Sequence, residues 1–305
     1  MKLGVVLPLF SGDPHKVLEA AREAEGLGFD GVFVFDHFFP PGAQSDRPSL
    51  EAFATLAAVA AATERVAIGT LVTRASLRPV GLLAKMASWV DAASGGRLIL
   101  GVGTGDPIDL PEHRAYGIPM PDKVERRAHL EETVAALRSL FAGGRFDGGR
   151  FVPPLEGPLA PLPSQSGGPP IWIGGQADQV VRIAARRADG WNGWGMDPRA
   201  FGGRARLARA EAAAAGRSIE ATWAGIVLAG VDRAETEELA DRRRARGLDD
   251  EAWVGTAEEL TGFLEALGDA GATWAVTVLA GPADRRALVA ERVLPALREA
   301  APRRA

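Results

Sequence analysis

The stretch FDGVFVFDHFF, residues 29–39, places an acid and a histidine directly after an apolar run. No polar residue interrupts the run from Val32 to Phe35, and Asp36 and His37 follow at once. Short runs that are apolar at every position are typical of parallel strands buried on both faces. The stretch therefore predicts a buried parallel strand with two titratable side chains at its carboxyl end.

The same alternation of a short apolar run and a longer helical segment continues along the chain. Strands are expected at 3–10, 31–36, 65–73, 97–105, 170–175, 189–194, 219–230 and 273–281. Helices are expected at 13–28, 49–62, 79–94, 123–142, 177–188, 197–216, 254–271 and 283–299. Eight strands that alternate with helices imply parallel crossovers, and a closed barrel fits this count better than an open sheet. We therefore predict an α/β protein with a single (β/α)8 TIM barrel.

Two of these helices have clear end signals. Asp13 suits an N-cap, Pro14 suits the first helical position, and Gly28 suits the stop of the first helix. Thr256 and Glu259 form the pattern of a capping box at the start of a later helix. These signals fix where the chain enters and leaves the expected helices.

The longest gap between expected strands separates the fourth strand from the fifth. It contains a charged helix, the sequence GGRFDGGRFVPP at 143–154, which suggests a small hairpin, and a Pro-rich tract. We therefore expect one domain over residues 1–305, with insertions after strand four and in the region before strand five, covering about 106–168.

The composition excludes several classes of protein. Apolar residues make up 47% and charged residues 24% of the chain, as in soluble globular proteins. The net charge is −4, and the Arg-rich stretch at 241–247 has acids beside it, which argues against a nucleic-acid partner. No window approaches 18 uninterrupted apolar residues, so no membrane span is expected. The apolar start is too short for a secretion signal, and a cytoplasmic protein is expected.

The residue types also limit the chemistry. Without cysteine there is no disulfide, no thiolate nucleophile and no Cys-ligated metal. His15, His113 and His129 have no partner at metal-ligand spacing, so we expect no metal site. The chain has no G-x-S-x-G motif, which gives serine-based hydrolysis little support.

Glycines and polar residues gather where the expected strands end. The third to sixth strands end in GTLVT, GVGTGD, IGGQAD and GWNGW. The active site of a barrel lies at the carboxyl ends of its strands, so these residues and His37 should line one mouth. The backbone N–H groups of IGGQAD could bind a phosphate, but an ordinary glycine-mediated helix start explains the sequence equally well. His37 is either a proton-transfer residue or a structural hydrogen-bonding residue.

Taken together, these segments resemble the luciferase-like monooxygenase superfamily, the bacterial-luciferase-type barrels that use a flavin or the deazaflavin coenzyme F420. The similar segments are 28–39, 65–105, 169–194 and 254–272, and 106–168 carries little resemblance. The resemblance implies a barrel that binds a flavin-like ring across its mouth.

The resemblance also implies roles for individual residues. Asp36 would contact the cofactor ring, and His37 would be catalytic, next to the ring carbon that carries the hydride. The Leu71-Val72 bond would be a cis peptide whose bulge presses on one face of the ring. The other implied cofactor-binding residues follow strand four or form the phosphate loop: Thr104, Gly105, Gly174, Gly175, Gln176 and Ala177.

Asp106 is a second catalytic candidate by resemblance, since it falls where a sugar-phosphate-oxidising subfamily has a catalytic glutamate. It is shorter than glutamate, and Pro107 follows it directly. Arg74 replaces a small residue of some relatives and could meet the cofactor or the substrate. The chain lacks the Lys/Arg cluster expected around a sugar phosphate.

Three functions remain open at this point. The first is an F420-dependent oxidoreductase that moves a hydride between the deazaflavin and a small organic substrate, with His37 handling the paired proton. The second is an FMN-dependent monooxygenase that uses dioxygen and receives reduced flavin from a partner reductase. The third is a non-catalytic flavin-binding barrel.

The phosphate loop favours coenzyme F420 over FMN. The sequence GGQAD has no Lys or Arg for the phosphate dianion of FMN. Arg182, Arg186 and Arg187 follow in the next helix, where the acidic tail of F420 could pass. By resemblance, the protein is expected to form a homo-oligomer, most simply a dimer.

Overall fold

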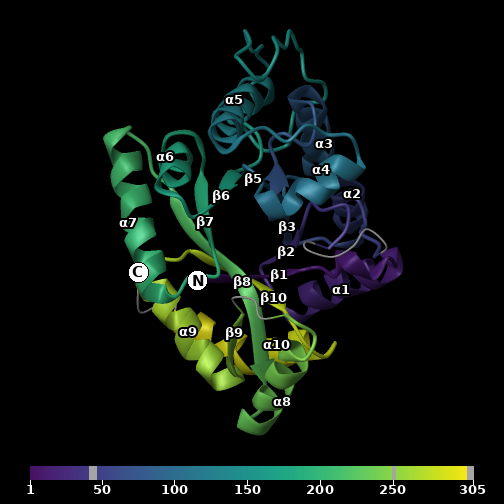
Figure 1. Ribbon diagram of the computed structural model, residues 1–305, viewed down its shortest axis with the longest axis vertical. Coiled ribbons are helices and arrows are strands. Elements are labelled where there is room, and N and C mark those ends of the chain that lie inside the picture. Colours follow the sequence, from purple (N-terminus) through teal and green to yellow (C-terminus); the bar gives the residue numbers. More distant parts are fainter. Residues whose placement is uncertain (41–46, 249–251, 301–305) are drawn as a thin grey trace.

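A computed structural model describes residues 1–40, 47–248 and 252–300. Its strands form one parallel sheet that closes on itself, with the helices arranged around the outside (Figure 1). The barrel strands are β1 (Lys2–Val6), β2 (Gly31–Val34), β3 (Ala67–Thr70), β5 (Leu98–Gly103), β6 (Ile171–Gly174), β7 (Gly190–Trp194), β8 (Glu220–Gly230) and β10 (Trp274–Leu279). They pair in chain order, and the β8–β10 and β10–β1 pairings close the ring. The predicted (β/α)8 barrel is confirmed.

Two further strands lie outside this ring order. β4 (Thr73–Arg74) continues the path of β3 beside the end of β5, and β9 (Trp253–Thr256) pairs with the last residues of the long strand β8. Neither was expected as a separate strand.

The helices occupy the positions predicted between the strands. Their bounds are α1 (Pro14–Leu27), α2 (Ala52–Ala62), α3 (Val80–Ala93), α5 (Lys123–Phe141), α6 (Asp178–Arg187), α7 (Pro198–Ala214), α9 (Ala257–Asp269), α10 (Arg285–Arg292) and α11 (Leu294–Ala300). Asp13 caps α1, Gly28 ends it with a positive φ of 89°, and Thr256 forms the predicted capping box with Glu259. The end signals in the sequence are therefore confirmed.

Other elements were not predicted. They are the short helices η1 (Leu9–Ser11), η2 (Pro107–Asp109) and α4 (Leu110–Ala115), and the longer helix α8 (Arg233–Arg244). β1 is shorter than expected, since Pro8 has no N–H to continue the ladder and η1 follows it.

The segment expected as an insertion, 106–168, has a regular and an irregular part. It includes α5, which packs against α3 and α6 like the other outer helices. After α5 the chain forms loops at the top of the view in Figure 1. The expected hairpin is reduced to one antiparallel bridge between Phe146 and Leu155. The carboxylate of Glu132 accepts the backbone N–H groups of residues 150–152, so these cannot form a strand ladder.

Phe33 of β2 lies at the centre of the barrel interior. Its ring stacks on Trp172 at a centroid distance of 5.6 Å and meets Trp274 edge-on at 5.9 Å. A Cβ atom added to any of three neighbouring glycines would lie within 3.0 Å of the Phe33 ring: Gly4, Gly31 and Gly69. The glycines make room for one large ring layer that fills the barrel below the mouth.

Among the described residues, no helix has both the length and the apolar composition that a membrane crossing requires. The cytoplasmic location stays a prediction.

Candidate active site

His37 follows β2 at the mouth of the barrel, among aromatic side chains. Side chains alternate along a strand, so Phe33, Phe35 and His37 share the inner face. The His37 ring lies 6.2 Å from the Phe35 centroid and 6.4 Å from that of Phe10, and Trp194 lies 5.9 Å from Phe35. The His37 side chain is 18% exposed. It is therefore largely shielded from water but reachable from the mouth.

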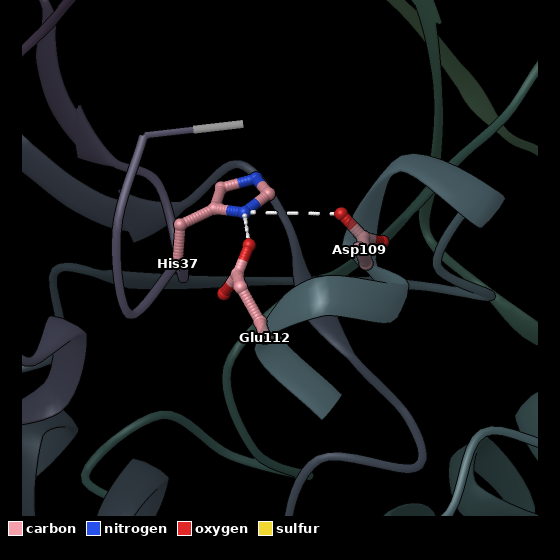
Figure 2. A group of neighbouring side chains, drawn as sticks. All are labelled: His37, Asp109 and Glu112. Atoms are coloured by element: carbon pink, nitrogen blue, oxygen red, sulfur yellow. Dashed lines mark hydrogen bonds and ion pairs between the residues drawn. The ribbon is translucent and has the colours of Figure 1, made fainter. Parts of the chain in front are cut away.

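Glu112, a buried residue of α4, holds one side of the His37 ring. Its Oε1 lies 2.6 Å from His37 Nδ1, and its Oε2 accepts the backbone N–H of Phe38 at 2.7 Å. Asp109 is farther away, with Oδ1 at 3.8 Å from the same Nδ1. Figure 2 shows both carboxylates on the Nδ1 side of the ring, with Nε2 on the opposite side.

Arg74 of β4 lies beside the two acids and is 4% exposed. Its Nη2 donates to Glu112 Oε2 at 2.9 Å and to the backbone oxygen of Asp36 at 3.1 Å, and its Nη1 lies 3.7 Å from Asp109. Within the part of the chain that the structure describes, its Nε and Nη1 atoms have no hydrogen-bond partner. A buried donor without a partner costs about 1–3 kcal/mol, so an oxygen of a bound molecule would stabilise this arginine.

The charge of Glu112 is set by these neighbours. Burial alone would raise the pKa of its carboxyl group. The hydrogen bond from His37, the N–H of Phe38 and the guanidinium of Arg74 outweigh burial and hold the pKa below its usual value. Glu112 is therefore an ionised acceptor at neutral pH, although its side chain is only 1% exposed.

Asp36 is bound to different partners from those of His37. It is 2% exposed, and its carboxylate accepts hydrogen bonds from Thr73 Oγ1 and from both terminal nitrogens of Arg78. Arg78 Nη2 also donates to Glu51. Burial would lower the pKa of Arg78, but the hydrogen bonds and charges of Asp36 and Glu51 raise it. The predicted contact of Asp36 with a cofactor ring stays a prediction.

His37, Asp109 and Glu112 could also be considered as metal ligands. One candidate ligand atom from each lies within 4.8 Å of the others. However, Arg74 forms ion pairs with both carboxylates, at 3.7 Å and 2.9 Å. The guanidinium already supplies the positive charge that a bound cation would bring.

The predicted cis peptide between Leu71 and Val72 is confirmed. It lies between β3 and β4, and the side chain of Val72 extends over glycines of two neighbouring strands. A Cβ atom on Gly101 or Gly103 would lie 2.8 Å or 2.7 Å from Val72, and one on Gly174 would lie 3.2 Å away. These glycines therefore leave space for Val72 at the mouth.

The predicted phosphate loop connects β6 to α6. Gly175 has a φ of +148°, and its oxygen accepts the indole N–H of Trp191 at 2.8 Å. Gln176 is exposed and donates to the backbone oxygen of Trp194 at 2.6 Å. Ala177 is the N-cap of α6 and provides no side-chain acceptor. The N–H of Val180 donates to the oxygen of Ala177 at 2.8 Å. In the part of the chain that the structure describes, the two N–H groups before it have no side-chain cap and are open to a ligand or to water.

The arginines of α6 lie at increasing distances from this loop, and two of them have acidic partners. Arg182 pairs with Glu211, and Arg187 pairs with Glu131. At 1.5 Å per residue, Arg182 lies about 6 Å and Arg187 about 13 Å along the helix axis from the first residue of α6. The expected path of an acidic cofactor tail along Arg182, Arg186 and Arg187 stays a prediction.

Asp106 adjoins the carboxylates near His37 through its backbone. Asp106 is exposed, and its backbone N–H donates to Asp109 Oδ2 at 2.8 Å. Thr104 Oγ1 donates to the oxygen of Gly105 at 3.2 Å, and Gly105 has a φ of +74° beside Arg74. The proposed roles of these residues stay predictions.

Sequence reasoning missed Glu112, Asp109 and the pairing of Arg74 with both. One signal was present: Asp109 and Glu112 are three residues apart, a spacing that puts two side chains on one face of a helix. The consecutive short helices that carry them, η2 and α4, were not predicted, so the spacing could not be interpreted.

A closed parallel barrel with its polar residues at the carboxyl ends of the strands is the architecture of (β/α)8 enzymes. Residues 1–294 match the sequence model of the family described as luciferase-like monooxygenase, and the chain belongs to that family.

Two curated relatives share part of the sequence. The chain is 32% identical over 185 residues to an F420-dependent glucose-6-phosphate dehydrogenase of Intrasporangium calvum, covering 58% of this chain and 53% of the relative. It is 33% identical over 213 residues to the protein of the same name from Nocardia farcinica, covering 68% and 62%. The chain thus spans about half the length of the curated relatives it matches.

A solved structure supports the fold over the whole chain. An F420-dependent secondary alcohol dehydrogenase in complex with an F420-acetone adduct superposes with a TM-score of 0.83 at 21% identity. The match covers 97% of this chain and 98% of the other.

Proposed function

We propose that this protein is an oxidoreductase that transfers a hydride between coenzyme F420 and a small organic substrate. The observation that carries the proposal is the position of His37 at the mouth, with Nδ1 held by Glu112 and Nε2 on the side of the ring opposite the carboxylates. Leu71 donates its N–H to Val34 at 2.8 Å, so His37 and Val72 follow the ends of adjacent strands. The F420-dependent relatives support this choice of coenzyme.

The residues at the mouth fit such a coenzyme in two places. Val72, which packs over the glycines of β5 and β6, provides an apolar surface for one face of the ring. The uncapped start of α6 provides backbone donors for the phosphate. The coenzyme would be held by the residues predicted from the sequence: Asp36, Leu71, Val72, Thr104, Gly105, Gly174, Gly175, Gln176 and Ala177.

When bound, oxidised F420 supplies the hydride acceptor, and in its reduced form it supplies the hydride donor. In the oxidative direction, His37 Nε2 would accept the hydroxyl proton of an alcohol while its C–H hydrogen left as hydride to the coenzyme, which would leave a carbonyl compound. In the reductive direction, His37 returns the proton to the carbonyl oxygen. The aromatic side chains around His37 limit the access of water to this proton transfer.

The mouth favours a neutral alcohol or carbonyl compound over a sugar phosphate. Phe10, Phe35 and Trp194 provide an apolar wall around His37. The two arginines nearest to it, Arg74 and Arg78, are already paired with carboxylates. Among the described residues, Arg74 Nε and Nη1 have no hydrogen-bond partner and could donate to a substrate oxygen. The neighbouring carboxylates would repel a phosphate dianion at this position, whereas they would not repel an uncharged alcohol or carbonyl oxygen.

We further propose that the protein forms a homodimer through α2 and α3. The sequence of α2, AFATLAAVAAA, has no charged residue. On α3, Leu82 and Trp89 are 51% and 59% exposed, and their spacing of seven residues puts them on one face. Lys85 is exposed between them on the same face, with its ammonium group bound to the backbone oxygen of Ala160. The apolar side chains on either side of it would pack against a second copy of this surface. Trp89→Glu should convert the dimer into a monomer, as measured by light scattering after gel filtration.

Binding of the coenzyme tests the proposed function. We expect saturable quenching of tryptophan fluorescence when the protein without cofactor is titrated with F420, and a much weaker response to FMN. Quenching by FMN alone would contradict the proposal and favour the flavin-dependent monooxygenase. The absence of a response to either compound would also contradict it.

A further inference from the structure

We propose that Glu112 is a positioning residue that fixes His37 as the tautomer with its proton on Nδ1 and thereby leaves Nε2 free as the proton acceptor. The consequence for turnover rests on the proposed function. The tautomer rests on the geometry of this chain alone and can be measured without any cofactor.

The distance between the two side chains determines which atom carries the proton. Nδ1 of His37 lies 2.6 Å from Oε1 of Glu112, well within hydrogen-bond distance. An ionised carboxylate can only accept, so Nδ1 must be the donor. A neutral imidazole carries one proton, and Nε2 is then an acceptor. Asp109 cannot set the tautomer in this way, since its oxygen is 3.8 Å from Nδ1.

The other oxygen of Glu112 keeps the carboxylate ionised and in place. Oε2 accepts from the N–H of Phe38 at 2.7 Å and from Arg74 Nη2 at 2.9 Å. Both of these partners can only donate. A proton on Oε2 would therefore point at two donors and find no acceptor there. Because the Phe38 N–H belongs to the residue after His37, one carboxylate fixes both the ring and the backbone that carries it.

This arrangement makes Glu112→Gln a direct test of which nitrogen of His37 carries the proton. A glutamine has one acceptor oxygen and one donor NH2 group. Phe38 and Arg74 present two donors on one side, so the oxygen of glutamine should turn toward them. Its NH2 group then faces His37 Nδ1, which must become an acceptor. We therefore expect the substitution to reverse the tautomer and put the proton on Nε2.

Nitrogen NMR of the cofactor-free protein observes the tautomer directly. The chain has only four histidines, so selective 15N labelling of their rings gives few signals, and His37→Gln identifies those of His37. In the wild-type protein we expect a protonated Nδ1 and an unprotonated Nε2 above the pH at which the ring loses its charge. In Glu112→Gln we expect the reverse, an unprotonated Nδ1 and a protonated Nε2.

Glu25→Gln is the matched control. Glu25 also accepts backbone N–H groups, those of residues 64–66, and it lies on α1 at the opposite end of the barrel. This variant loses a comparable carboxylate without touching His37. It should leave the His37 nitrogen signals and the turnover number unchanged.

Turnover provides the second readout. In hydrolases with a carboxylate–imidazole pair, an amide in place of the carboxylate lowers kcat by about 10⁴-fold through the wrong tautomer. For Glu112→Gln we expect a loss of at least about 10²-fold in kcat, with little change in the Kd of F420. A purely structural residue would instead lower thermal stability and affinity together.

The outcomes separate this inference from the proposed function. A wild-type His37 with its proton on Nε2 would overturn the inference even if Glu112→Gln failed to fold. So would a Glu112→Gln protein with wild-type His37 signals and wild-type kcat. If wild-type protein has the expected tautomer but never reacts with F420, the proposed function fails and the positioning of His37 by Glu112 stands.

Discussion

The two sides of the barrel mouth use different chemistry. At the ends of β2 and β4, and on α4, the functional groups are charged side chains joined by hydrogen bonds, such as Asp36, Arg74 and Glu112. At the end of β6 they are backbone N–H groups at the start of α6, which has no side-chain cap. One side can hold and orient a proton, which needs a titratable side chain. The other can hold a phosphate, which needs several N–H donors.

This difference separates the expected effects of substitutions. Changes on the side of His37 should alter the turnover number and leave cofactor affinity nearly constant. Changes at the start of α6 should alter affinity and leave the turnover number nearly constant.

The largest effect is expected for His37→Ala. Removal of a proton-transfer group lowers the rate by about 10²–10⁴-fold, and the ring is partly exposed at the mouth, so the protein should remain folded. Steady-state kinetics and an F420 titration measure kcat and Kd separately. Wild-type turnover in this variant would remove His37 from the chemistry, and failure to fold would favour a structural histidine.

The opposite side of the mouth is tested by Gly175→Ala. Gly175 has a φ of +148°, and a Cβ atom there would lie 2.8 Å from Val180 Cγ1. The strain costs about 1–3 kcal/mol and should displace the start of α6. We expect F420 affinity to fall by about tenfold or more with kcat at saturating F420 retained. A selective fall in kcat would mean that the two sides of the mouth are not separable.

Glu25→Gln probes the base of the barrel, which both sides share. Burial would raise the pKa of Glu25, but its hydrogen bonds from the N–H groups of Arg65, Val66 and Glu64 lower it. A group whose pKa is lower in the folded state stabilises the protein above its unfolded pKa, and this contribution is lost as the pH falls through the folded pKa. We expect the substitution to cost about 1 kcal/mol at neutral pH, since Glu25 is partly exposed.

Urea unfolding of both proteins at neutral and at acidic pH measures this difference. The difference in the free energy of unfolding between wild type and Glu25→Gln should decrease as the pH falls below the usual pKa of a glutamate. A gap that widens in acid would show that the carboxylate is not stabilised by these hydrogen bonds.

The smallest effect is expected for Asp106→Asn. The side chain is exposed, and the residue joins the His37 cluster through its backbone N–H, which the substitution retains. Exposed substitutions usually change free energies by less than about 0.5 kcal/mol, so kcat should fall by less than about threefold. A loss as large as that of His37→Ala would restore Asp106 as the catalytic acid in place of the Glu112–His37 pair.

The barrel could be predicted from the sequence because its signals are local. Buried parallel strands are short apolar runs, and helices such as α1 begin at capping residues such as Asp13. Most elements can therefore be recognised from about ten consecutive residues. The same locality placed His37 and Asp36 at the mouth, because a residue after a barrel strand must lie there.

The partners of His37 could not be predicted because they depend on distant contacts. Glu112 is 75 residues away from His37, on a six-residue helix with Pro111 in its first turn. The hairpin at 143–154 failed for a similar reason, since the side chain of Glu132, on another element, takes the N–H groups of its second strand. α8 was not predicted because few apolar residues mark its buried face.

One measurement tests the central claim most directly. The protein is mixed anaerobically with oxidised F420 and, in separate samples, with small secondary alcohols or glucose 6-phosphate, and the visible absorbance of the oxidised coenzyme is followed. The account predicts loss of this absorbance with a neutral alcohol, no need for dioxygen, and little reaction with the sugar phosphate. No loss with any alcohol, together with dioxygen consumption when reduced FMN is supplied, would contradict it.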